Sequence, residues 1–133
     1  MAESRSVDNA TDVREFPKGR VEVVTVGTAT VTRSTMEPGW RWSECVKPIA
    51  GTGSCQVQHN GYGISGRLRV RQDDRTEIEI SPGDAYSIPP GHDGWVLGDE
   101  PWVGVDFSPT MADFAKVPAA SGRPLPHGEG GQL

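Results

Sequence analysis

The sequence predicts an all-β fold, and three observations lead to this prediction. The 133 residues include 17 glycines and 11 prolines, and only 35% of them are hydrophobic. Short runs of β-branched and aromatic residues recur along the chain. Turn signals rich in glycine, proline and aspartate separate these runs. Many short strands joined by tight turns are typical of a sandwich or barrel, and we expect eight to ten strands.

The first strands are expected after a polar arm. Residues 1–15 are polar and aperiodic, which predicts a flexible N-terminal arm. Residues 20–35 are rich in valine and threonine and predict either one long strand or two strands broken near Gly27. Trp40 and Trp42 then alternate with polar residues, so a further strand is expected on which both indoles share a face.

The remaining strands follow at short intervals. One strand is expected to run from Cys55 through His59 toward Gly66, with Cys55 and His59 on the same face. Further strands are expected at 68–71, 76–80, 85–88, 94–97 and 102–107. Residues 16–110 would then form one barrel domain. Residues 111–133 hold little apolar pattern beyond one or two possible helical turns, and we expect a largely disordered C-terminal tail.

Composition and charge argue against several classes of partner. The net charge is −5, and the 13 basic residues form no run with interleaved aromatics, so a nucleic-acid partner is not expected. Arg67, Arg69 and Arg71 alternate along one strand and predict a solvated outer face. The chain lacks a long apolar run and the features of a secretory signal, so no membrane partner is expected and the predicted location is cytoplasmic.

The chain contains two cysteines. Cys45 and Cys55 are too few for a disulfide framework, and in a reducing compartment we expect two free thiols.

The segment 82–99, PGDAYSIPPGHDGWVLGD, resembles the second motif of the cupin superfamily. In that motif a glycine is followed after five residues by Pro-any-Gly, then two residues, a metal-binding histidine, three residues and an asparagine. The matching positions are Gly83, Pro89 and Gly91. The histidine and asparagine positions fall on Gly94 and Gly98, so His92 lies two residues before the expected ligand.

A stretched version of the first cupin motif lies upstream. That motif runs glycine, five residues, His-any-His, three or four residues, glutamate, six residues and glycine. Counted from Gly39, the two histidine positions fall on Cys45 and Lys47. Eleven residues then intervene before His59, which six residues separate from Gly66, so His59 occupies the glutamate position.

The resemblance spans roughly residues 20–107 and implies a cupin-like double-stranded β-helix, a jelly-roll barrel. It also implies a small-molecule pocket inside the barrel near one open end. The implied metal ligands are Cys45, His59 and His92, which would hold one divalent transition metal ion such as Zn, Fe, Ni, Mn or Cu. Cys55 or Asp93 could complete this set. Each candidate also has a structural interpretation, such as Cys45 as a small buried apolar residue.

Four further residues are candidates for ligand binding: Trp42, Lys47, Tyr62 and Trp95. The aromatic rings would supply flat apolar walls, and the ammonium group would attract an anion. Two functions stay open at this point. The first is a metal-dependent enzyme acting on a small molecule; the second is a metal-free module that captures a small molecule for sensing or transport. The resemblance also implies a homodimer formed through edge pairing of the N-terminal strands.

Overall fold

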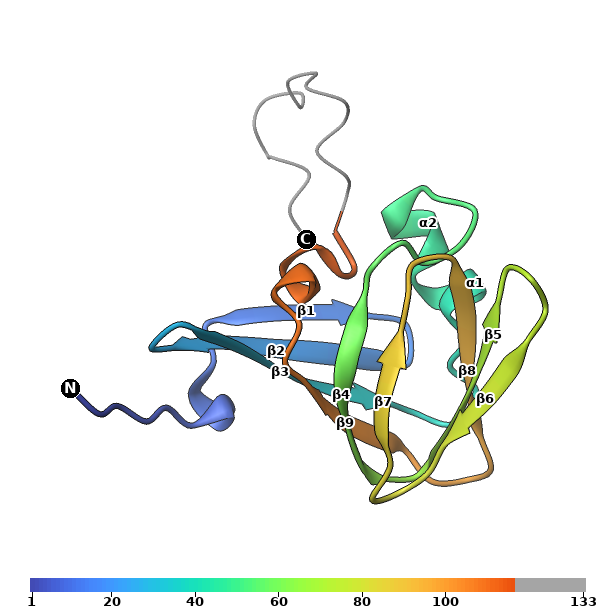
Figure 1. Cartoon of the computed structure of the whole chain (residues 1–133). Helices are drawn as coiled ribbons and strands as arrows, with labels where there is room; N and C mark the ends of the chain where they lie inside the picture. Colours follow the sequence, from blue (N-terminus) through green and yellow to red (C-terminus); the bar gives the residue numbers. More distant parts are fainter. Residues whose placement is uncertain (117–133) are drawn as a thin grey trace.

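The computed structural model describes residues 1–116 and arranges them mainly as two facing antiparallel sheets (Figure 1). The six-stranded sheet has the order β1 (Asp12–Phe16), β2 (Gly19–Val26), β3 (Ala29–Met36), β9 (Trp102–Asp106), β4 (His59–Ser65) and β7 (Ala85–Ile88). The three-stranded sheet has the order β6 (Glu77–Ile80), β5 (Arg67–Gln72) and β8 (His92–Leu97). Nine strands in the described part of the chain confirm the all-β prediction and the expected number.

Four short helical segments complete the described residues: η1 (Val7–Asn9), α1 (Trp42–Cys45), α2 (Lys47–Ala50) and η2 (Pro109–Asp113). No helix within residues 1–116 has the length and apolar character needed to cross a bilayer.

The N-terminal strands form a hairpin that projects from the barrel, with an added edge strand (Figure 1). The hairpin turns at Gly27, whose φ of +57° suits glycine, so the two-strand alternative for residues 20–35 is confirmed. The expected arm of residues 1–15 is too long, because β1 begins at Asp12 and pairs with β2. Arg14 and Phe16 point inward from this strand and are buried. A polarity pattern assigns arginine to the surface, so the buried Arg14 was counted as part of the polar arm and the start of β1 was missed.

The prediction of a strand carrying Trp40 and Trp42 is wrong, because α1 and α2 occupy this region. At the start of α1, the backbone N–H of Ser43 donates to Asp93 Oδ1 on β8 at 3.0 Å, so a residue distant in sequence caps the helix. Pro48 lies in the first turn of α2, where its missing N–H costs nothing. Both indoles are nevertheless buried and line the same interior cavity.

The later strands agree with the sequence to within a few residues. β5 to β9 follow the predicted runs, with β8 beginning at His92 rather than Gly94. Gly66 joins β4 to β5 with a φ of +75°, and a Cβ there would collide with the backbone carbonyl of Pro101. The core between the two sheets is made of aliphatic and aromatic side chains, among them Met36, Trp40, Leu68, Val70, Ile80, Ile88 and Trp102.

The segment after β9 folds back onto the barrel. Met111 and Phe114 are buried in the same core, so the expected tail does not begin at residue 111. The buried Arg14 guanidinium donates to the carbonyl oxygens of Met111 and Phe114, both at 2.9 Å. The C-terminal part of the predicted tail, residues 117–133 with His127, lies outside the described residues.

Candidate metal centre and ligand cavity

Three strand ends and one loop bring four polar side chains together inside the barrel. His59 begins β4, His92 begins β8, and Asp106 ends β9. Cys55 precedes β4 and is fixed to β8 by two backbone hydrogen bonds, Cys55 N–H to His92 O at 2.7 Å and His92 N–H to Cys55 O at 3.2 Å. The loop that carries the thiol is therefore held against the strand that carries the second imidazole.

The ligand atoms of Cys55, His59 and His92 converge. One nitrogen of each imidazole and the Cys55 sulfur all lie within 4.8 Å of one another. Cys55 Sγ is 3.8 Å from His59 Nε2, and the centroids of the two imidazole rings are 5.0 Å apart. All three side chains are largely withdrawn from solvent. The arrangement has the residue types and the closeness of a three-ligand metal site.

The other nitrogen of each histidine is held by an oxygen acceptor. His59 Nδ1 is 3.2 Å from Asp106 Oδ2, and His92 Nδ1 is 2.9 Å from the carbonyl oxygen of Pro89. A carbonyl oxygen accepts only, so His92 Nδ1 carries a proton, and its Nε2 is the nitrogen left for the cluster. Asp106 is itself fixed, because the Ser108 backbone N–H donates to Oδ1 at 2.7 Å. Metal-binding histidines in proteins usually have such outer partners.

The cluster shifts the pKa values of its members. Burial alone would raise the pKa of the Cys55 thiol, but hydrogen bonds and charge from His59 and His92 outweigh it and lower the pKa to about 6. Burial would lower the pKa of His59, whereas Asp106 and Cys55 favour the imidazolium and raise it to about 9. In the metal-free protein near pH 7, the two groups therefore form a thiolate–imidazolium pair. Burial, followed by the charge of Asp106, also raises the pKa of Tyr86.

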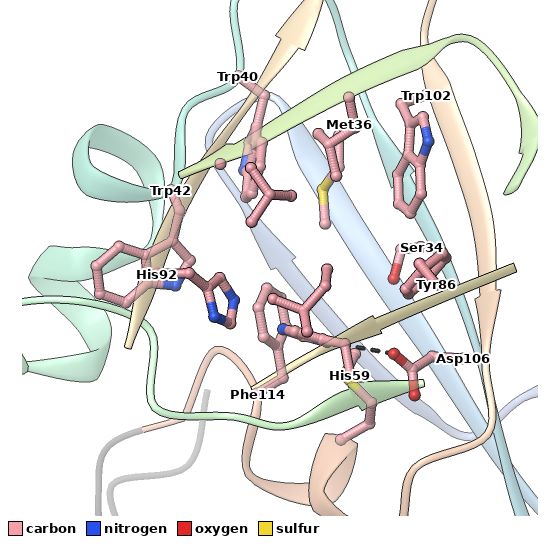
Figure 2. A pocket seen from close by; sticks show the side chains of 15 residues that line it. Ser34, Met36, Trp40, Trp42, His59, Tyr86, His92, Trp102, Asp106 and Phe114 are labelled. Carbon is pink, nitrogen blue, oxygen red and sulfur yellow. Dashed lines mark hydrogen bonds and ion pairs between the residues drawn. The ribbon is translucent and has the colours of Figure 1, made fainter. Parts of the chain in front are cut away.

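Next to the cluster lies a small interior cavity, which we call the inner chamber, with a volume of about 50 Å³ (Figure 2). Most of its wall is apolar. The polar exceptions include His59, His92, Asp106, Ser34 and Tyr86, whereas the apolar part includes Met36, Trp40, Trp42, Leu68, Val70, Ile88, Trp102, Met111 and Phe114. Figure 2 shows His59 and His92 projecting toward the same space, with Asp106 behind His59.

Of the three metal ligands inferred from the sequence, His59 and His92 come together and Cys45 does not join them. Cys45 is buried among apolar residues in α1, and Cys55 supplies the sulfur instead. A signal for Cys55 exists in the sequence. Three residues separate it from His59, which equals the spacing between the second histidine and the glutamate of the first cupin motif. Counting back from Gly66, rather than forward from Gly39, reaches it.

The other candidates fall mostly outside the cavity. Of the four residues expected to bind ligand, Trp42 lines the inner chamber, whereas Lys47 is exposed on α2 and Tyr62 is 45% exposed on the outer face of β4. Trp95 lies on the outer face of β8, beneath the Arg41 guanidinium at 4.2 Å. Period-two alternation explains the position of Trp95, since its neighbour Val96 is buried on the inner face of the strand.

Asp93 and Asp106 differ in their relation to the cluster. Asp93 caps α1 and pairs with Arg41 at 3.4 Å, so it does not join the cluster. Asp106, which does join it, was missed by the sequence analysis because no motif marks it.

The comparisons with known proteins agree with the architecture. No protein-family model matches the chain, and no curated protein matches it either. Among solved structures, a protein of unknown function from Rhizobium leguminosarum has a TM-score of 0.56 and 16% identity, covering 80% of this chain and 97% of that one. A Klebsiella pneumoniae protein with a double-stranded β-helix domain has a TM-score of 0.53 and 19% identity, covering 80% and 88%.

An enzyme is also among the similar structures. Oxalate decarboxylase from Lactobacillus farciminis, in a formate complex, has a TM-score of 0.52 and 19% identity. The match covers 71% of this chain and 30% of the enzyme. Identities this low speak for fold alone. By its strands, its facing sheets and these similarities, the chain has a double-stranded β-helix fold.

Proposed function

We propose that this protein binds one divalent transition metal ion through Cys55 Sγ and the Nε2 atoms of His59 and His92, and that a small molecule occupies the remaining coordination position. The observation that carries the proposal is the convergence of three ligand atoms whose imidazoles are both held at Nδ1 by oxygen acceptors. A tetrahedral zinc ion separates neighbouring sulfur and nitrogen ligands by about 3.4–3.6 Å. The 3.8 Å between Cys55 Sγ and His59 Nε2 is close to that spacing.

The donor set favours some metals over others. One thiolate with two imidazoles suits Zn, Fe, Ni or Cu better than Mn, which prefers oxygen ligands. Three protein ligands with one position left open are typical of catalytic rather than structural zinc sites. A bound ion would act as a Lewis acid on the small molecule. Asp106 would orient His59, and Ser34 and Tyr86 would present hydroxyl groups to a ligand in the inner chamber.

The alternative function is metal-free capture of a small molecule by the same cavity. Its supporting observation is that His59 has two partners within the protein without an ion, because its Nε2 is 3.8 Å from Cys55 Sγ and its Nδ1 is 3.2 Å from Asp106 Oδ2. In this alternative the protein is a sensor or carrier. A ligand would then stabilise the protein equally with and without a chelator, which a thermal-shift panel of metabolites measures.

Metal analysis of protein purified without added metal tests the main proposal, followed by titration with Co²⁺. We expect about one equivalent bound and a sulfur-to-cobalt charge-transfer band in the near ultraviolet. Cys55→Ser should abolish the band, and the matched variant Cys45→Ser should keep it, because Cys45 lies outside the cluster. Less than about a tenth of an equivalent, with no binding on reconstitution, would contradict the proposal.

Location and assembly are further parts of the proposal. Both cysteines are free thiols, which fits the reducing cytoplasm. Within residues 1–116, β1 ends the six-stranded sheet with one unpaired edge, which fits a homodimer formed by edge pairing. Light scattering on the purified protein measures the mass, and a value near the 14.3 kDa of one chain would rule out the dimer.

A further inference from the structure

Two hollows border the candidate metal centre, and two side chains line both of them. The inner chamber is lined by His59 and His92, among others. A second hollow of about 300 Å³, which we call the outer cleft, is lined by Cys55 and by polar residues of η2 and the loop before β4. Trp42 and Phe114 line both. The metal-ligand candidates thus lie along the boundary between a very small space and a larger one.

Phe114 is packed into this boundary by contacts on two sides. Its ring lies edge-on to the His59 imidazole, with centroids 5.7 Å apart, and edge-on to the Phe16 ring at 6.1 Å. It is 3% exposed. Figure 2 shows the Phe114 ring beside His59.

The backbone that carries Phe114 is tied down from β1. Arg14, 2% exposed, donates through Nη1 to the carbonyl oxygens of Met111 and Phe114. Its guanidinium is balanced by a paired contact with Asp12, in which Nη2 is 2.7 Å from Oδ2 and Nε is 3.2 Å from Oδ1. A charged donor to two buried carbonyls fixes this segment more firmly than apolar packing alone.

We propose that Phe114 is the specificity-determining residue of the site: it closes the inner chamber against the outer cleft and limits the ligands that fit beside His59 and His92 in that chamber to about three or four non-hydrogen atoms. The size follows from the chamber volume of about 50 Å³. At about 15 Å³ for one water on this measure, the space holds about three waters or a ligand of that size. The part of the proposal that concerns a ligand on the metal rests on the proposed function.

The first experiment does not need a metal. Fluorobenzene is added to the apo protein, and its ¹⁹F resonance is monitored for broadening and shift. Replacing Phe114 with alanine leaves a space that fits one benzene ring, as engineered apolar cavities do. We expect no binding to the wild type and saturable binding to Phe114→Ala. The matched control is Phe107→Ala, which removes an exposed ring and should bind no fluorobenzene.

The second experiment uses the Co²⁺-loaded protein and two ligands of different size, azide with three non-hydrogen atoms and imidazole with five in a ring. Both are followed by the d–d spectrum of the cobalt. In the wild type we expect azide to bind and imidazole to bind at least tenfold more weakly. In Phe114→Ala we expect the affinity for imidazole to rise at least tenfold while the affinity for azide changes less than threefold.

The outcomes separate the two claims. If cobalt does not bind but fluorobenzene enters Phe114→Ala alone, the proposed function fails and the role of Phe114 stands. If cobalt binds but the ratio of azide to imidazole affinity is the same in both proteins, or fluorobenzene binds the wild type, the role of Phe114 is refuted. Should Phe114→Ala lose its native circular dichroism, Phe114→Leu keeps apolar packing and is tested by the same two measurements.

Discussion

Two polar regions of this molecule contain similar numbers of charged groups and differ in burial. One is the buried cluster of Cys55, His59, His92 and Asp106 at the candidate metal centre. The other is the Arg–Glu ladder of Arg67, Arg69, Glu77 and Glu79 on the outer face of the three-stranded sheet, with ion pairs of 3.3–3.5 Å.

Burial, rather than the number of charges, decides what each region contributes to the protein. The ladder side chains keep about a third to a half of their surface in solvent, so water screens each pair. In the cluster, Asp106 and His59 are almost completely shielded from water. Removing one partner would leave the other buried without its ion-pair partner. The cluster can therefore shift pKa values and bind an ion, whereas the ladder supports solubility and strand pairing.

The largest effect is expected for His59→Ala. The substitution leaves the buried Asp106 carboxylate without its imidazole, and we expect the free energy of unfolding to fall by about 3–5 kcal/mol. Denaturant titration measures it. A loss below about 1 kcal/mol would show that the cluster is as well solvated as the ladder.

A smaller loss is expected for Arg14→Gln, which tests a buried cation away from the cluster. The variant removes charge-assisted hydrogen bonds to the carbonyls of Met111 and Phe114. We expect the free energy of unfolding to fall by about 2–3 kcal/mol, by the same denaturant titration. A loss equal to that of Arg69→Gln would mean that these contacts do not hold the segment after β9.

The pH dependence of the cluster follows from its two shifted groups. The Cys55 pKa is lowered to about 6, so its contribution to stability is present at high pH and is lost as the pH falls through 6. The His59 pKa is raised to about 9, so its contribution is present below its ordinary value of 6.5 and is lost as the pH rises through 9.

The measurement compares wild type with Cys55→Ser. The difference in their free energy of unfolding should fall by about 1 kcal/mol between pH 7 and pH 5, because one pKa unit corresponds to about 1.4 kcal/mol. Thiolate absorbance near 240 nm should show a midpoint close to pH 6 in the wild type. A midpoint near the ordinary thiol value would mean that the imidazoles do not stabilise the thiolate.

The smallest effect is expected in the ladder. Arg69→Gln removes both ion pairs of Arg69, to Glu77 and Glu79, yet the free energy of unfolding should change by no more than about 0.5 kcal/mol. The change should shrink further at 1 M salt, where the screening length is about 3 Å. A loss above 1 kcal/mol that persists at high salt would remove the contrast with the cluster.

Residues 59–107 were predictable because their pattern is local. Alternation of apolar and polar residues located β5 and β6, and glycine and proline located the turns around β7. The same alternation placed the arginines of the ladder on an outer face. These features depend on residues that are neighbours in the chain, so they can be predicted from a sequence pattern.

Residues 37–58 were not predictable in this way. The capping of α1 by Asp93 and the bridge between Cys55 and His92 both join segments about 40–50 positions apart in the chain. Trp40 and Trp42 have a strand-like spacing, and a contact from another strand overrides it. The resemblance to the cupin motifs made His59 and His92 candidates, although His92 lies two residues before the ligand position of the motif. Choosing between Cys45 and Cys55 required knowing which thiol lies beside them.

Strand periodicity and turn chemistry are properties of the chain, so the fold class and the turns could be predicted from it, and the motif resemblance made His59 and His92 candidates. The meeting of Cys55, rather than Cys45, with those histidines, the contact of Asp106 with His59 and the place of Phe114 in the chamber wall became known from the folded structure alone. The physical reason is that burial and charge pairing arise between segments that only folding brings together, and pKa values and cavity size follow from them.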